Sequence, residues 1–247
     1  MVKRFMIGLS LGWLLWGIGI MQAQEPLPLI AVANEEIRIW SGEGPLEAYT
    51  ACQPPEEITG RLIPSPDGSQ FLIATLPPVI QEAIQSQAFF GELPFSVNLW
   101  LCDIATDTLT RIVATEGGDE PFTGILPQFP DIRSEPRWSP DGTQLVWTKF
   151  TPETQRTAIA LYNIAAQTSE ERPLDVPPPF GFPVPPPVEW RGDIAYITVF
   201  VFDEELYIEQ EQLFLYDVAQ RQIVGNFALA AGGEADDFIA DRIWVTL

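Results

Sequence analysis

Apolar and polar residues alternate in short runs along most of this chain, and turn signals separate the runs. The segments "FLIATL" from Phe71 and "LVWTKF" from Leu145 are apolar, β-branched or aromatic, which is typical of strands. Each follows a Ser-Pro-Asp-Gly turn, in which proline sets φ, aspartate bonds its own backbone and glycine takes a positive φ. These turns consist of Ser65, Pro66, Asp67, Gly68, Ser139, Pro140, Asp141 and Gly142. The pattern therefore predicts two β-hairpins in which these residues have a structural role.

A second pattern recurs three times, later in each unit. It begins at Asn98 with "NLWLCDIATDTLTRIV", at Ala158 with "AIALYNIAAQTSEERPL" and at Gln212 with "QLFLYDVAQRQIVGNF". The shared positions run from Cys102 to Ala105, from Tyr162 to Ala165 and from Tyr216 to Ala219. A fainter copy starts at Ile37. Each copy predicts a second hairpin, so one unit contains four strands.

The first hairpin recurs in altered form in "PVEWRGDIAYITVF", and "FIADRIWV" from Phe238 is a further relic. Arg191, Gly192 and Asp193 fall where the repeat places its turn, so we interpret them as structural and not as an adhesion motif. Four-stranded units that recur with a turn signal in each are typical of a β-propeller. We therefore expect an all-β fold, with residues 24–247 forming a single β-propeller domain of four or five four-stranded blades.

The motifs "RWSPDGTQLVWTK" and "LYNIAAQT" resemble the TolB-type, WD40-like propeller repeat, also called PD40. The resemblance implies contacts with other proteins of the bacterial cell envelope, made through loops or the central funnel. Members of this family usually have six blades, and the partner-binding N-terminal domain of TolB is absent here, so no role in the Tol system is implied. We expect the segment from Phe238 to Leu247 to pair beside the segment from Ile30 to Trp40 and so close the ring.

The N-terminal sequence and the net charge indicate the cellular compartment of the protein and the ligand classes that it does not bind. Lys3 and Arg4 precede an apolar run that ends near Met21, and small residues follow around Ala23, which predicts a signal peptide over residues 1–23. An uncleaved membrane anchor is the alternative. Without these residues, 34 acidic and 11 basic residues remain (13 less Lys3 and Arg4), a net charge of −23. We therefore expect a periplasmic or secreted monomer that binds no nucleic acid, and no membrane beyond the signal segment.

Cys52 and Cys102 are the two cysteines of the chain. Disulfides persist in exported proteins, and a bridge would close a long loop, but two buried thiols are the alternative.

Two insertions interrupt the repeat. In the first, Ile80, Ile84 and Ala88 are expected on one face of a short helix. The second is proline-rich and contains Phe180 and Phe182; it is a stiff connection between blades or a polyproline segment that presents these rings.

The residue types limit the chemistry that is available. The chain has no histidine, which excludes Ser-His-Asp and Cys-His systems and the usual zinc sites that contain imidazole. Acids are abundant, and some of them cluster: Asp119, Glu120, Asp203, Glu204, Glu205, Asp236 and Asp237. None stands at a spacing that identifies a catalytic pair or a Ca²⁺ loop. We therefore name no catalytic or cofactor-binding residue and expect no cofactor, with Ca²⁺ as a weak alternative.

Aromatic residues are frequent in the predicted strands: Trp100, Trp138, Trp147, Tyr162, Trp190, Tyr216 and Trp244. Packing between blades is the expected role for most of them, and a minority can line a groove. The sequence thus predicts an exported, non-catalytic propeller that binds cell-envelope proteins or acts as a scaffold. The alternative is a carboxylate-based, glycan-active enzyme or a Ca²⁺-dependent carbohydrate-binding protein that uses the funnel.

Overall fold

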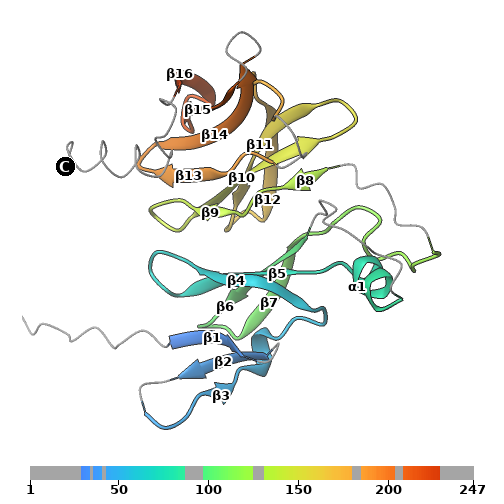
Figure 1. The fold of residues 1–247 in the computed structure, drawn as a ribbon. Helices are drawn as coiled ribbons and strands as arrows, with labels where there is room; N and C mark the ends of the chain where they lie inside the picture. Colours follow the sequence, from blue (N-terminus) through green and yellow to red (C-terminus); the bar gives the residue numbers. More distant parts are fainter. Residues whose placement is uncertain are drawn as a thin grey trace, which may run out of the picture.

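The chain folds almost entirely into antiparallel β-sheets in the computed structural model, which describes residues 29–33, 36–40, 43–86, 97–124, 131–179, 185–203 and 208–228. Four sheets follow one another in chain order and are arranged in a fan (Figure 1). The first sheet contains β1 (Leu29–Ala33), β2 (Glu36–Trp40) and β3 (Glu47–Ala48), and the second contains β4 (Ile58–Pro64), β5 (Gln70–Thr75), β6 (Asn98–Asp103) and β7 (Thr108–Val113). The third contains β8 (Ile132–Arg133), β9 (Arg137–Trp138), β10 (Gln144–Thr151), β11 (Arg156–Asn163) and β12 (Thr168–Pro173). The fourth contains β13 (Val188–Arg191), β14 (Ile194–Asp203), β15 (Ile208–Asp217) and β16 (Gln222–Ala228).

Each full sheet is built from two hairpins, and the chain then returns to start the next sheet. The order β4-β5-β6-β7 in the second sheet recurs as β13-β14-β15-β16 in the fourth. In the third sheet, both β8 and β9 pair with β10, so two short strands share the first position. The first strands of neighbouring sheets contact each other, as β9 and β13 do. This is how the blades of a β-propeller are connected.

Apolar side chains from facing sheets form the core. Ile37 of the first sheet packs in one cluster with Phe71 and Ile73 of the second. Leu72 packs with Trp147 and others between the second and third sheets. Between the third and fourth sheets lies the largest cluster, with Val146, Ile159, Leu161, Leu174, Val188, Ala195, Ile197, Val199, Val201, Phe214 and Tyr216. Each sheet therefore depends on its neighbours for burial of its apolar face.

The second repeated pattern forms the same corner in three sheets. Cys102, Tyr162 and Tyr216 are buried and occupy equivalent register positions on β6, β11 and β15. The next residue accepts the amide of the residue three positions later, as Asp103 does from Thr106 at 3.0 Å. Asn163 and Asp217 repeat this bond with Ala166 and Gln220. The last residue of each corner has a positive φ of 52° to 60°: Asp107, Gln167 and Arg221. The repeat is therefore a local backbone geometry as well as a sequence pattern.

One short helix lies outside the sheets and differs in part from the expectation. It is α1 (Pro78–Gln85), and it buries Val79, Ile80 and Ala83. The predicted short helix is present, and Ile80 and Ile84 stand one turn apart on it, but Ile84 is 45% exposed and Ala88 lies outside the described residues. The Val79 amide donates to the Gly118 carbonyl at 3.0 Å, which ties the start of α1 to the segment after β7.

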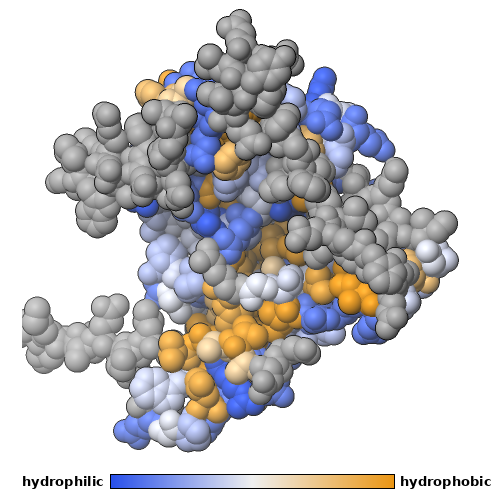
Figure 2. Space-filling model, in the orientation of Figure 1, coloured by the Kyte–Doolittle hydropathy of each residue, from blue (hydrophilic) through white to orange (hydrophobic). Residues whose placement is uncertain are grey.

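Several sequence predictions fall on residues that the structure does not describe. These are the signal peptide over residues 1–23, the rings of Phe180 and Phe182, and closure by Phe238 to Leu247. The first sheet has three described strands, so the total number of blades stays a prediction. Within the described ranges, no helix is long and apolar enough to cross a membrane. Figure 2 shows apolar side chains over the lower half of the viewed face, where the first two sheets lie, and more hydrophilic ones above.

Candidate functional site: a crevice between the third and fourth sheets

The Ser-Pro-Asp-Gly turns are held by a compact network of hydrogen bonds. In the third sheet, the Ser139 hydroxyl donates to Asp141 at 2.6 Å and accepts the amide of Gln144 at 2.9 Å. Asp141 Oδ1 also accepts the amide of Thr143 at 3.1 Å. These bonds, chiefly that from Ser139, lower the pKa of Asp141. The second sheet repeats the network with Ser65, Asp67, Ser69 and Gln70. Gly68 and Gly142 adopt φ of 70° and 71°, which an L-residue tolerates poorly.

The corresponding turn of the fourth sheet is shorter. Trp138 pairs with Leu145 in the third sheet, and the equivalent Trp190 pairs with Ala195 in the fourth. Six residues therefore separate the pair in the third sheet and four in the fourth. Turns of the second and third sheets lie against each other, since a Cβ built on Gly142 would be 3.6 Å from Pro66 Cδ. The turn of the fourth sheet is two residues shorter, and an open space lies between it and the turn of the third sheet.

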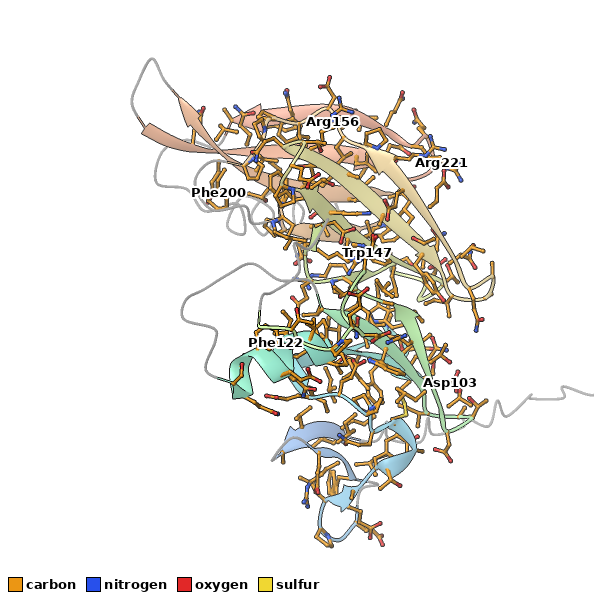
Figure 3. All side chains as sticks on the ribbon, turned by 90° about the vertical axis from the view of Figure 1, so that its right-hand side faces the viewer. Asp103, Phe122, Trp147, Arg156, Phe200 and Arg221 are labelled. Atoms are coloured by element: carbon orange, nitrogen blue, oxygen red, sulfur yellow. A yellow bond between two sulfur atoms is a disulfide. The ribbon has the colours of Figure 1, made fainter. Side chains whose placement is uncertain are left out.

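A crevice of about 690 Å³ occupies the space between the third and fourth sheets. Its volume lies within the range of about 300 to 1,000 Å³ that is usual for ligand sites. The third sheet contributes Ser139, Pro140, Asp141, Gln144, Leu161, Asn163, Ala166, Thr168 and Glu170. The fourth contributes Trp190, Gly192, Asp193, Val218, Ala219 and Arg221. Figure 3 shows that the sheet corners lie on one side of the molecule, with Asp103 and Arg221 at the same edge and Phe122 and Phe200 at the other.

Trp190 gives the crevice a half-buried aromatic wall. Its indole Nε1 donates to the Gly192 carbonyl at 3.0 Å, and this bond fixes the ring beside the short turn. The ring packs at the margin of the cluster that contains Leu161, and Val218 packs there too. The indole thus has one side supported by the core and lines the crevice with the remainder.

Tyr216 lies in the same cluster and carries a polar atom that the fold does not use. The residue is 2% exposed, and its hydroxyl has no hydrogen-bond partner among the residues that the structure describes. Burial raises the pKa of Tyr216, and its hydroxyl interacts electrostatically with Arg172, Glu170 and Arg221. Two of these three, Glu170 and Arg221, line the crevice. A buried hydroxyl without a partner costs about 1 to 3 kcal/mol.

The charged groups of the crevice are unevenly compensated. Glu170 is paired with Arg172 at 2.6 Å and with Arg221 at 3.0 Å. In contrast, no hydrogen bond or ion pair joins the Asp193 carboxylate to another described residue. Asp141 and Asp193 belong to the turns that follow β9 and β13, two strands that contact each other, whereas Glu170 lies on β12 and Arg221 in the turn after β15. The carboxylates without a counter-ion among the described residues are therefore on the β9–β13 side of the crevice, with Trp190 of β13.

A second polar cluster lies inside the second sheet and is structural. Glu56 is 9% exposed, and its carboxylate accepts bonds from Asn98 at 3.0 Å, from Trp100 Nε1 at 3.2 Å and from the Thr75 hydroxyl. Arg111 is 3.6 Å from the same carboxylate. Because these donors surround Glu56, the carboxylate joins three strands and has little capacity for a ligand.

The acids that the sequence singled out do not meet as a pair in the described residues. Asp119 forms a two-pronged contact with Arg111 at 2.9 Å, and Arg111 also lies over the Trp100 ring, 5.8 Å from its centre. Glu204, Glu205, Asp236 and Asp237 lie outside the described ranges. Where the chain is described, no three cysteine or acidic side chains gather closely enough to hold a metal ion. Binding of Ca²⁺ stays a hypothesis.

The two cysteines lie together between the first and second sheets. Cys52 ends a short 3₁₀ helix (Thr50–Cys52), Cys102 lies on β6, and both are fully buried. They form a disulfide with Cα atoms 5.6 Å apart. Of the aromatic residues, Trp138, Trp147 and Tyr162 pack between the second and third sheets, and Trp244 lies outside the described residues.

Comparisons with known proteins concern the fold. No family model and no curated protein matches the chain. Among solved structures, the propeller domain of the trilobed protease of Pyrococcus furiosus is similar, at 10% identity and a TM-score of 0.44, over 71% of this chain and 43% of that one. An acylaminoacyl peptidase of Pyrococcus horikoshii matches at 12% identity and a TM-score of 0.45, over 79% and 27%. TolB of Acinetobacter baumannii matches at 13% identity and a TM-score of 0.38, over 84% and 53%.

These similarities contradict one expectation from the sequence. We expected a protein without enzymatic activity, but the solved structures that match include enzymes, namely acylaminoacyl peptidases and an oligogalacturonate lyase of Vibrio parahaemolyticus. The fold therefore gives no ground for excluding an activity. At 12% and 13% identity, the similarity shows the fold alone and assigns no reaction to this chain. The chain also spans less than half the length of the first solved chains it matches.

The sequence contained one signal of the crevice. Trp190 and the turn from Arg191 to Asp193 form an altered copy of the hairpin, and this turn is two residues shorter than the Ser-Pro-Asp-Gly turn of the third sheet. The length difference alone does not predict an opening between the sheets. For Glu56, the sequence carries no signal, because its hydrogen-bond donors come from β5 and β6 and its ion-pair partner Arg111 from β7.

Proposed function

We propose that this chain is an exported propeller that binds an extended segment of another cell-envelope protein in the crevice between the third and fourth sheets. The single observation that supports this most is the crevice itself, about 690 Å³ in volume and lined by both sheets. Export rests on the N-terminal pattern, and the cell envelope on the resemblance to the TolB-type repeat.

The shape and chemistry of the crevice suit a segment of polypeptide. Its walls combine apolar surface from Trp190, Leu161 and Val218 with polar groups from Asn163 and Thr168. An aromatic anchor with a few hydrogen-bonding groups around it is a common arrangement at sites where proteins bind one another. The walls come from two sheets that are packed through a large cluster, so the site is already formed without a ligand.

A blocking substitution tests this proposal. Peptides are selected from a random heptapeptide display library on the immobilised full chain, and their affinity is measured by calorimetry. Ala219→Arg places a long side chain at an exposed corner that lines the crevice. Ala105→Arg makes the same change at the equivalent corner of the second sheet, which the crevice does not include.

We expect Ala219→Arg to weaken binding at least about tenfold and Ala105→Arg to leave it unchanged. Trp190→Ala should weaken binding as well, with Trp40→Ala as its control. Trp40 is a matched residue because its indole also donates to a glycine carbonyl, that of Gly44, at 3.0 Å. Equal effects of the two arginine substitutions, or no selected peptide at all, would contradict the proposed function.

A further inference from the structure

The end of the crevice beside Trp190 carries two carboxylates that the described fold does not neutralise. Asp141 uses Oδ1 for the bonds of its turn, from Ser139 and from Thr143, and Oδ2 accepts no bond from a described residue. Asp67, in the equivalent turn of the second sheet, differs because the Ser69 hydroxyl lies 2.9 Å from both of its oxygens. The second carboxylate is that of Asp193, which is part of the short turn.

An indole and two carboxylates form the usual surroundings of a cationic side chain. A guanidinium or ammonium group is attracted by the face of an indole, which contributes about 0.5 to 2 kcal/mol. Carboxylates add charge-assisted hydrogen bonds. The remaining acid of the crevice, Glu170, is already paired with Arg172 and Arg221, so the negative charge without a partner lies beside Trp190. The net charge of −21 favours the approach of a cation from a distance.

We propose that the crevice selects a polypeptide segment with an arginine or lysine side chain. The cation lies against Trp190 between the carboxylates of Asp141 and Asp193. This inference rests on the proposed function, because it names the kind of segment that the same crevice holds.

Three capped tripeptides test the selection: acetyl-Gly-Arg-Gly-amide, its glutamine analogue and its glutamate analogue. Each is titrated into the ¹⁵N-labelled full chain while the indole N–H signal of Trp190 is followed. We expect the arginine peptide to bind about tenfold more tightly than the glutamine peptide, and the glutamate peptide to bind least. The advantage of arginine should shrink as NaCl rises from about 20 to 500 mM, because salt screens exposed charges.

Matched variants distinguish the role of the carboxylates in binding from their role in the hydrogen bonds of the turn. Asp141→Asn keeps the oxygen that the turn needs, so we expect it to remove most of the preference for arginine, as should Asp193→Asn. Asp67→Asn makes the same change in the same turn network away from the crevice and should leave the preference intact. An equal response to Asp141→Asn and Asp67→Asn would overturn the assignment of the carboxylates.

The outcomes distinguish the two proposals. If arginine and glutamine peptides bind equally well at the Trp190 signal, segment binding stands and selection of a cation fails. If no tripeptide shifts the signal and no library peptide is blocked by Ala219→Arg, both proposals fail.

Discussion

Loss of the bridge between Cys52 and Cys102 should destabilise the protein strongly, and the structure allows the size of the effect to be estimated. The two residues are separated by 50 positions in the sequence. In the chain-entropy model a loop of this length lowers the entropy of the unfolded chain by about 14 cal/mol/K, which corresponds to about 4 kcal/mol at 25 °C. For a protein of this size, about 4 kcal/mol lowers the melting temperature by roughly 10 °C.

The bridge matters for more than entropy because of where it lies. Both cysteines pack with Ile37, Phe71 and Ile73 in the cluster between the first and second sheets. The 3₁₀ helix that carries Cys52 is the connection between these sheets. Without the bridge, we expect the first sheet, which has three described strands, to separate from the second before the rest of the protein unfolds.

Urea denaturation of the oxidised protein and of a Cys52→Ala, Cys102→Ala double variant measures the effect. Reductant should lower the midpoint of the natural protein and leave that of the double variant unchanged. Two free thiols in the oxidised, purified protein, or identical midpoints with and without reductant, would refute this reasoning.

Three further predictions concern stability. Asn98→Ala removes donors to the buried Glu56 carboxylate and the acceptor of a backbone amide. We therefore expect the free energy of unfolding, measured by urea denaturation, to fall by about 3 kcal/mol. A loss below about 1 kcal/mol would show that the carboxylate is not buried in this network. Ser139→Ala should cost about 1 kcal/mol, since it removes two bonds of the third-sheet turn, and an unchanged melting temperature would contradict the turn network. Hydrogen bonds, from Ser65 and from Gln70 respectively, lower the pKa of Asp67 and of Asp103 in the folded protein. The contribution of these two carboxylates to stability is therefore present above the unfolded pKa of about 4 and is lost as the pH falls below it. The acid-induced fall in melting temperature should therefore be smaller in Asp67→Asn and Asp103→Asn variants than in the natural protein.

The repeated hairpins could be predicted because their causes are local. A Ser-Pro-Asp-Gly turn needs only its own residues and the next amide, as the bonds of Ser139 show. The corners after Cys102, Tyr162 and Tyr216 also close within five residues. The strands and hairpins of each sheet can therefore be predicted from the sequence pattern, and the packing of neighbouring sheets follows from the apolar face that each sheet presents.

Features that depend on two distant segments could not be predicted. In α1, Ile80 is buried and Ile84 is 45% exposed although one helical turn separates them, and the sequence periodicity does not encode the contact of Val79 with Gly118. The crevice lies between one turn of the third sheet and one turn of the fourth. It becomes apparent only when the positions of both turns are known from the structure. The Glu56 network joins the segment between the first two sheets to three strands. In the sequence, a glutamate that follows two prolines and precedes a second glutamate does not predict such a network.

The most direct test of the account is the footprint of a selected peptide in hydrogen–deuterium exchange on the full chain. The account predicts slower exchange at residues 139–144, 163–168, 190–193 and 218–221, which surround the crevice, and no change in the first sheet. Protection confined to the first two sheets, or spread evenly over the chain, would contradict the claim that the crevice between the third and fourth sheets is the binding site.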